Sequence, residues 1–210
     1  MKCRGKETRK QIVKEYNITP ILHTILLNGQ RKHSDAEAII ENEYYVFEAI
    51  RKSDRKKEVI QCGMGAARDF LSLINHSGLT LFNPLKIKNK DIKKDIETNK
   101  KTETEWHPTA KQLYNAIMWI FLLWDIKPDT PVFTFRDDII KYKGCKPLYW
   151  KIKRVNTTIQ RLGKGKRLTE YIEVLKSEND FKEEIYNFSL LNNEIEKMKD
   201  NLGNKINSFF

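Results

Sequence analysis

The chain has 210 residues and a formal net charge of +11, and 40% of its residues are hydrophobic while 32% are charged. Four tryptophans and this apolar share exclude a largely disordered chain, and the longest apolar run, 116–124, is shorter than the about 20 residues of a membrane span. Because residues 1–16 are polar and charged, and three cysteines form no C-x-x-C pair, we expect a cytoplasmic protein without a secretory signal or a membrane partner.

The first part of the chain predicts a hairpin followed by a helix. Residues 6–16 predict a short charged helix, and residues 18–27 are apolar enough for a strand or a buried helical turn. The clearest strand signal is EYYVFEAI at 43–50, and a second β-rich run at 56–62 follows a polar turn. Residues 66–75 then carry apolar side chains at helical spacing.

The segment CGMGAARDF at 62–70 resembles the second half of treble-clef-like zinc modules of small phage and mobile-element proteins. In those modules a C-x-x-C-G knuckle precedes a hairpin that ends in V-G-S-x-C-x-x-x-F. Gly63 and Phe70 stand on the glycine and the phenylalanine, but Ala66 occupies the ligand position, and the first knuckle near 32–36 also lacks its cysteines. The resemblance covers residues 30–75 and implies a zinc-free relative, so no metal and no other cofactor is expected.

The stretch 86–105 marks a change in composition, because lysines and acids alternate there with few apolar residues. It is typical of a linker. We therefore predict an α+β protein with three parts: a hairpin-and-helix module at 1–85, a lysine-rich linker at 86–107 and a mostly helical domain at 108–210.

The helical domain begins with a predicted buried helix at 109–125, followed by a short extended piece at 132–135. A second helix, about 135–143 with Ile139 and Ile140 inward, would end at the turn Gly144-Cys145-Lys146. The third helix, 147–162, would start at Pro147 and end before Gly163. The last two helices have the outline of a helix-turn-helix pair, whose second helix lies in the DNA major groove.

Ten basic residues and no acid lie in the stretch 141–167, which therefore holds +10 of the net +11. Leu148, Ile152, Val155, Ile159 and Leu162 form an apolar stripe that should face the core. The expected nucleic-acid-binding set lies on the opposite side, on the flanks and at both ends of the helix: Lys146, Trp150, Lys151, Lys153, Arg154, Thr157, Arg161, Lys164, Lys166 and Arg167. A basic stripe on one element is typical of nucleic-acid binding, and we favour DNA over RNA as the partner.

The C-terminal part predicts a helix at 168–176 and a longer one at 179–202 with apolar residues at spacings of three and four. This longer helix either packs on its own domain or forms the seam of a homodimer. Packing is the favoured alternative.

Two other functions stay open at this stage. The basic face could dock on an acidic protein, as in a protein-binding module. Cys62, which follows a strand and precedes a helix, could serve as the nucleophile of a cysteine hydrolase with His76 or His107 as its base. No nuclease signature and no phosphate-binding G-x-x-x-x-G-K-S/T loop is present, so we expect a binding protein without catalytic residues.

Overall fold

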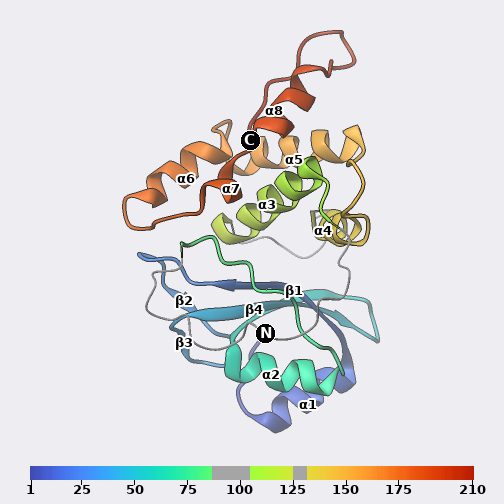
Figure 1. The fold of residues 1–210 in the computed structure, drawn as a ribbon. Coiled ribbons are helices and arrows are strands. Elements are labelled where there is room, and N and C mark those ends of the chain that lie inside the picture. The colour runs from blue at the N-terminus through green and yellow to red at the C-terminus, as the bar shows by residue number, and fades with distance from the viewer. Residues whose placement is uncertain (87–104, 125–131) are drawn as a thin grey trace. The chain divides into compact units, whose positions relative to one another are not determined.

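The structure is a computed structural model that describes residues 1–86, 105–124 and 132–210 (Figure 1). The protein is α+β, as the sequence predicts, and it divides into two compact units. The described residues of the first unit are 1–83, and those of the second are 84–86, 105–124 and 132–210.

The central part of the expected linker at 86–107, residues 87–104, lies outside the described residues. The Lys86 N–H donates to the Asp180 carbonyl at 2.8 Å, and the Trp106 and Tyr114 rings lie 5.1 Å apart. Residues 86 and 105–107 therefore belong to the second unit.

The first unit contains two helices and five strands within the described residues. Its three-stranded antiparallel sheet has the order β1-β4-β5, and the short strands β2 and β3 form a separate pair. The elements are α1 (Lys6–Glu15), β1 (Tyr16–Ile25), β2 (Lys32–His33), β3 (Ile39–Ile40), β4 (Glu43–Arg51), β5 (Lys57–Gly63) and α2 (Met64–Leu73). The predicted hairpin is thus β4–β5, and the apolar run at 18–27 is a strand.

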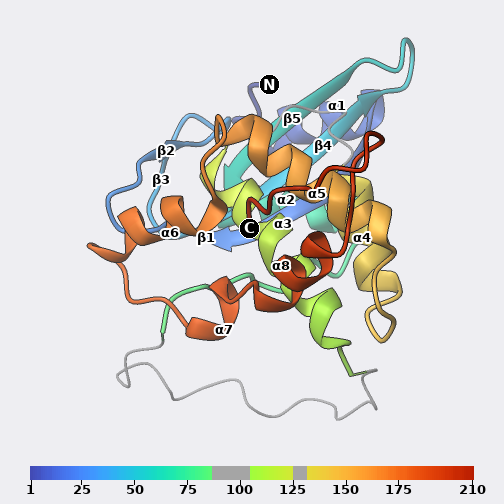
Figure 2. The ribbon, with the colours of Figure 1, turned by 90° about the horizontal axis from the view of Figure 1, so that it is seen from above.

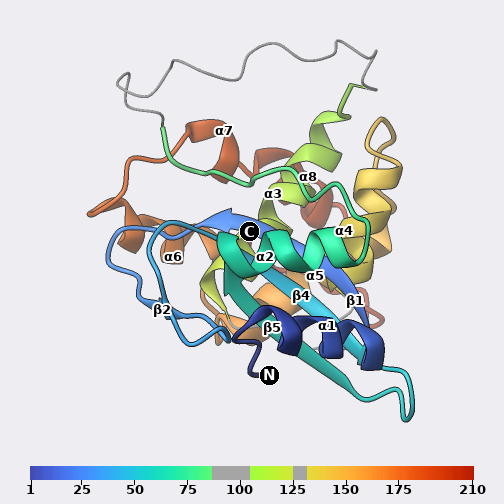
Figure 3. The same ribbon diagram turned by 90° about the horizontal axis from the view of Figure 1, so that it is seen from below.

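Helices α1 and α2 lie against the same face of this sheet (Figure 3). The period-two alternation of β4 directs Tyr45, Phe47 and Ala49 to that face, where all three are buried. Phe70 of α2 packs on Phe47 with ring centroids 5.4 Å apart. The helix after the hairpin is therefore held by the hairpin's own apolar residues.

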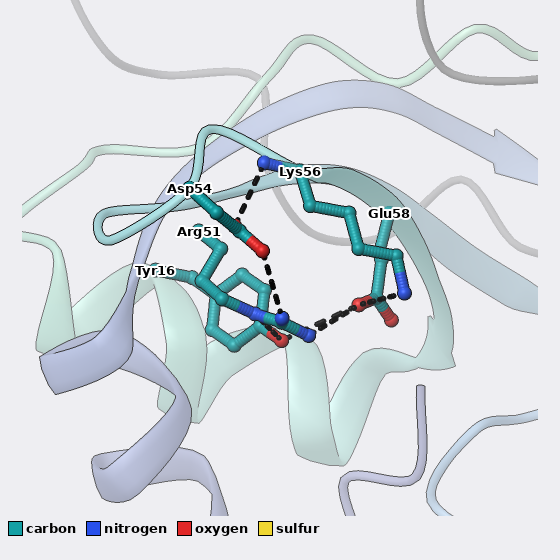
Figure 4. Close-up of polar contacts among 5 residues, drawn as sticks. All are labelled: Tyr16, Arg51, Asp54, Lys56 and Glu58. Carbon is teal, nitrogen blue, oxygen red and sulfur yellow. Dashed lines mark hydrogen bonds and ion pairs between the residues drawn. The ribbon is translucent and has the colours of Figure 1, made fainter.

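A polar network closes the far end of the hairpin (Figure 4). Arg51 donates to the Tyr16 hydroxyl at 2.9 Å, to Asp54 at 3.1 Å and to Glu58 at 3.3 Å. The backbone N–H of Lys56 donates to Asp54 at 3.0 Å. Because these groups form hydrogen bonds with one another, we assign the network to holding the turn in place and not to catalysis or ligand binding.

The second unit is helical in its described residues. Its elements are α3 (Pro108–Leu123), α4 (Val132–Lys141), α5 (Tyr149–Leu162), α6 (Leu168–Lys176), α7 (Glu183–Tyr186) and α8 (Ser189–Glu196). Helix α3 lies among the others (Figure 2) and is apolar on nearly all sides, so Leu113, Ile117 and Trp119 are fully buried. In the described part of the chain, no helix is long and apolar enough to cross a membrane.

Two predictions for this unit are wrong. The expected extended piece at 132–135 is the first turn of α4, because Val132 and Phe135, three residues apart, are both buried. The expected helix at 179–202 is divided into α7 and α8. Asn187 separates them with a ψ of 113°, and its side-chain oxygen accepts the Ser189 N–H at 3.0 Å, an alternative to the helical hydrogen bond.

The division of this helix removes the continuous dimer seam that the sequence suggests. Phe181, Phe188, Leu191 and Ile195 are buried in the second unit, whereas Leu202, the end of the expected stripe, is exposed. The packing alternative therefore agrees with the structure.

Candidate nucleic-acid interface

The buried side of α5 follows the predicted stripe in its centre. Ile152, Val155 and Ile159 are fully buried, and the intervening Asn156 is buried as well. Asn156 binds the C-terminal segment through both atoms of its amide, which accept from Phe209 and donate to Asn207. The apolar and polar anchors together fix which side of α5 faces outward.

The start of α5 differs from the prediction. The helix begins at Tyr149 rather than at Pro147, and Leu148 is its N-terminal flanking residue with a ψ of 139°. This extended backbone takes the Leu148 side chain off the helical stripe, and the side chain is 59% exposed. Ile140 of α4, also expected inward, is exposed, although its neighbour Ile139 is buried.

The outward side of α5 carries four of the predicted residues: Trp150, Arg154, Thr157 and Arg161 are all exposed. Trp150 meets the ring of Phe135 on α4 edge-on, with centroids 5.6 Å apart. The Arg154 guanidinium lies 5.9 Å from the centre of the same ring. One side chain of α4 thus supports both an exposed aromatic ring and an exposed cation of α5.

A tight turn at 163–166 continues this basic face beyond α5. A Cβ atom on Gly163 would lie 2.8 Å from the Lys166 carbonyl oxygen and 2.9 Å from that of Ile159, so the turn requires glycine there. Lys164 has a φ of 49° and Gly165 a φ of 85°, both in the left-handed region. The backbone N–H of Lys166 donates to Gly163 at 2.9 Å, which closes the turn.

Five of the predicted basic residues form no ion pair in the described part of the chain. Arg154, Arg161, Lys164, Lys166 and Arg167 are exposed, and none of them forms an ion pair with another residue in the described ranges. Five exposed cations without a side-chain ion pair among the described residues therefore lie along α5 and just beyond it, and the Glu170 carboxylate accepts the Arg167 backbone N–H at 2.8 Å.

Three of the predicted cations are placed otherwise. Lys151 is 12% exposed in its side chain and pairs with Asp138 of α4 at 2.8 Å, so it stabilises the contact between the two helices. Lys146 pairs with Glu194 of α8 at 3.0 Å. Lys153 is half-buried. Their role in nucleic-acid contact stays a prediction. The ion pairs of Lys151 and Lys146, which the sequence alone could not show, make these lysines weaker candidates than cations without an ion pair.

The connection between α4 and α5 runs from Tyr142 to Leu148. It is longer than the three or four residues that join the helices of a helix-turn-helix. Both helices also pack on α3, and the Lys151–Asp138 pair and the Phe135–Trp150 contact join them to each other. The helix-turn-helix interpretation stays a prediction, with an altered turn.

The first unit offers little support for a reactive cysteine. Cys62 is fully buried beneath α2, and burial raises the pKa of its thiol far above the usual value. Burial likewise raises the pKa of Cys3 to about 11. A nucleophilic cysteine requires the opposite, an accessible thiol with a lowered pKa.

The resemblance to zinc modules concerns the same region. Gly63 precedes α2 and Phe70 is buried on it, while Asp35 accepts the Gln61 N–H at 2.7 Å. Among the described residues, no group of three or more His, Cys, Asp or Glu side chains is arranged to hold a metal ion. The relationship to those modules stays a prediction.

The comparison with family models matches residues 1–201. The chain belongs to the family described as uncharacterised conserved protein UCP028583. The match runs through both units. No curated protein and no solved structure matches the chain.

Two further aromatic residues of this surface, Tyr142 and Tyr149, are exposed and were not predicted from the sequence. A signal for them exists, because each stands near a lysine: Tyr142 lies between Lys141 and Lys143, and Tyr149 precedes Trp150 and Lys151. Interleaved aromatic and basic residues on an exposed segment favour nucleic-acid contact.

Proposed function

We propose that this protein binds nucleic acid through the outward side of α5 and the turn that follows it. The observation that carries the proposal is a set of five exposed cations whose side chains form no ion pair in the described ranges: Arg154, Arg161, Lys164, Lys166 and Arg167. A phosphate backbone is a regular row of negative charges and matches such an arc of cations.

The geometry divides this surface into two roles. Lys164 and Lys166 lie in the turn and Arg167 directly before α6. All three are suited to phosphate contacts, which position a nucleic acid without reading its sequence. Arg154 and Arg161, two turns apart on the exposed side of α5, carry the forked donors that can pair with a guanine edge.

A binding titration with DNA at several salt concentrations tests the proposal. Arg154→Glu with Arg161→Glu should weaken binding strongly and lower the salt dependence, whose slope reports the number of phosphates contacted. The matched control is Arg55→Glu with Arg68→Glu, because these two arginines are exposed in the first unit and their reversal changes the net charge equally.

The proposal fails if the wild-type protein does not bind, or if the control weakens binding as much as the α5 variant. Retention of an acidic protein at high salt, with fixed stoichiometry and no binding of nucleic acid, would instead favour the docking alternative. We infer a cytoplasmic location as part of this proposal, because all three cysteines are unpaired and cytosolic thiols are kept reduced.

A further inference from the structure

We propose that the preferred ligand is single-stranded nucleic acid, whose unpaired bases stack on Tyr142, Tyr149 and Trp150. This inference rests on the proposed function and specifies its ligand class. The three residues lie in the α4–α5 connection and the first turn of α5. We refer to them as the aromatic platform.

The exposure of the aromatic platform is its first unusual property. Tyr142 and Tyr149 are each 55% exposed and Trp150 is 50% exposed, whereas Trp119 of α3 is fully buried. Leaving large rings in water forgoes the stabilisation that burial of their area would give. A ligand that covers the rings would recover it.

The ammonium group of a lysine lies over each ring of the aromatic platform. The Lys141, Lys146 and Lys151 ammonium groups lie 5.3, 5.3 and 5.5 Å from the ring centres of Tyr142, Tyr149 and Trp150, respectively. Lys146 and Lys151 are also tied to Glu194 and Asp138, so they hold the rings in place. Lys141 is exposed without an ion pair in the described part of the chain and can reach a phosphate.

A small hollow adjoins Tyr142. Its volume is about 240 Å³, and Tyr142, Leu148, Lys146 and Lys151 are among the residues that line it. This is below the ~300–1,000 Å³ of pockets for drug-sized molecules. Of the three platform rings, Tyr142 lines the hollow itself, while Lys146 and Lys151, which also line it, lie over the rings of Tyr149 and Trp150.

The platform also joins the basic face. Trp150 and Arg154 contact the same ring, that of Phe135. A strand whose phosphates follow Arg154 and Arg161 would therefore have its bases within reach of Trp150. In a duplex the base faces are stacked on each other and are unavailable, whereas in a single strand they can stack on aromatic side chains.

The test compares a fluorescein-labelled oligothymidylate with a duplex of equal phosphate number at one salt concentration. We expect the wild-type protein to bind the single strand more tightly. Tyr142→Leu, Tyr149→Leu and Trp150→Leu should each weaken single-strand binding about 5- to 150-fold and weaken duplex binding clearly less. An oligouridylate in the same assay distinguishes RNA from DNA as the source of the strand.

The control variant is Tyr186→Leu on α7, since its ring also carries a lysine, Lys176, at 3.9 Å. It should bind both probes as the wild type does, and thermal melts should show that all variants fold. Quenching of tryptophan fluorescence by the oligonucleotide should disappear in Trp150→Phe.

The outcomes separate the two proposals. Failure of the wild type to bind either probe removes both. Duplex binding equal to or tighter than single-strand binding, or platform variants that bind the single strand normally, would remove the inference while leaving the proposed function. Equal losses in Tyr186→Leu would also overturn it.

Discussion

The backbone N–H of Phe209 donates to the side-chain oxygen of Asn156 at 2.7 Å. The amide nitrogen of Asn156 in turn donates to the Asn207 carbonyl at 2.9 Å. One residue in the middle of α5 thus binds the C-terminal segment on both sides. The rotation of α5 about its axis, and with it the outward position of Arg154, depends partly on this contact.

Asn156→Ala should therefore lower the stability of the protein. The Phe209 N–H would lose its partner in a partly buried place, which costs about 1–3 kcal/mol, while water can reach the exposed Asn207. Urea unfolding measures the change. Gln160→Ala, an exposed change on the same helix, is the control, and a loss as large there would contradict the assigned role.

Lys164→Gly should separate binding from stability. A side chain at a φ of 49° is strained by about 1–2 kcal/mol, which offsets the roughly 0.5–1 kcal/mol entropic cost of glycine. Stability should stay equal or rise while the affinity for nucleic acid falls. Lys166→Gly is the control, because it removes the same charge at a residue without a positive φ. This variant should lose both stability and affinity for nucleic acid. Thermal melts and titrations together decide the outcome.

Glu194 should contribute to stability in a pH-dependent manner. Its carboxylate is buried, and the hydrogen bond from Lys197 and the ion pair with Lys146 hold its pKa below the usual value. Because the folded pKa is lowered, the stabilisation is complete above the unfolded pKa of about 4.3 and is lost as the pH falls through the folded value.

Glu194→Gln should accordingly be less stable at neutral pH and should lose less stability than the wild type on acidification. Urea unfolding at neutral pH and below about pH 4.3 measures both effects. Glu196→Gln, on the exposed side of the same helix, should follow the wild type. Parallel curves for all three proteins would argue against the assigned pKa shift.

The cysteines should react with a mild alkylating agent in a fixed order. Cys145 is exposed and should react first, whereas Cys3 and Cys62 are buried and should react only on unfolding. Cys145→Ser should thus protect the folded protein from labelling, as mass spectrometry can show. Cys62→Ala should cost on the order of 1 kcal/mol through a small cavity and leave nucleic-acid binding intact. Rapid labelling of Cys62 would revive the hydrolase alternative.

Elements with strong local patterns are predictable from this sequence. The alternation in β4 and the three-four spacing of Ile152, Val155 and Ile159 each give the correct buried side. The break between α7 and α8 is not predictable in this way, because the side chain of Gln112 on α3 accepts the Leu190 N–H at 2.9 Å. That partner comes from a distant part of the chain.

In the candidate site, too, features set by the local sequence are predictable, whereas contacts with distant parts of the chain are not. Helical geometry places Arg154 and Arg161 outward, and the charge pattern of the sequence identifies the stretch. The ion pairs of Lys146 and Lys151 could not be predicted, because their partners, Glu194 and Asp138, lie on other helices. A count of lysines along a sequence does not show which of them are already neutralised.

The five unpaired cations of α5 and its turn also act on one another. Packed along a short arc, they repel, and this repulsion opposes the compact state of the unbound protein. Salt at about 0.1 M screens charges beyond roughly 10 Å and should relieve the repulsion, while it weakens attraction to a polyanion. Ionic strength should therefore move folding stability and ligand affinity in opposite directions.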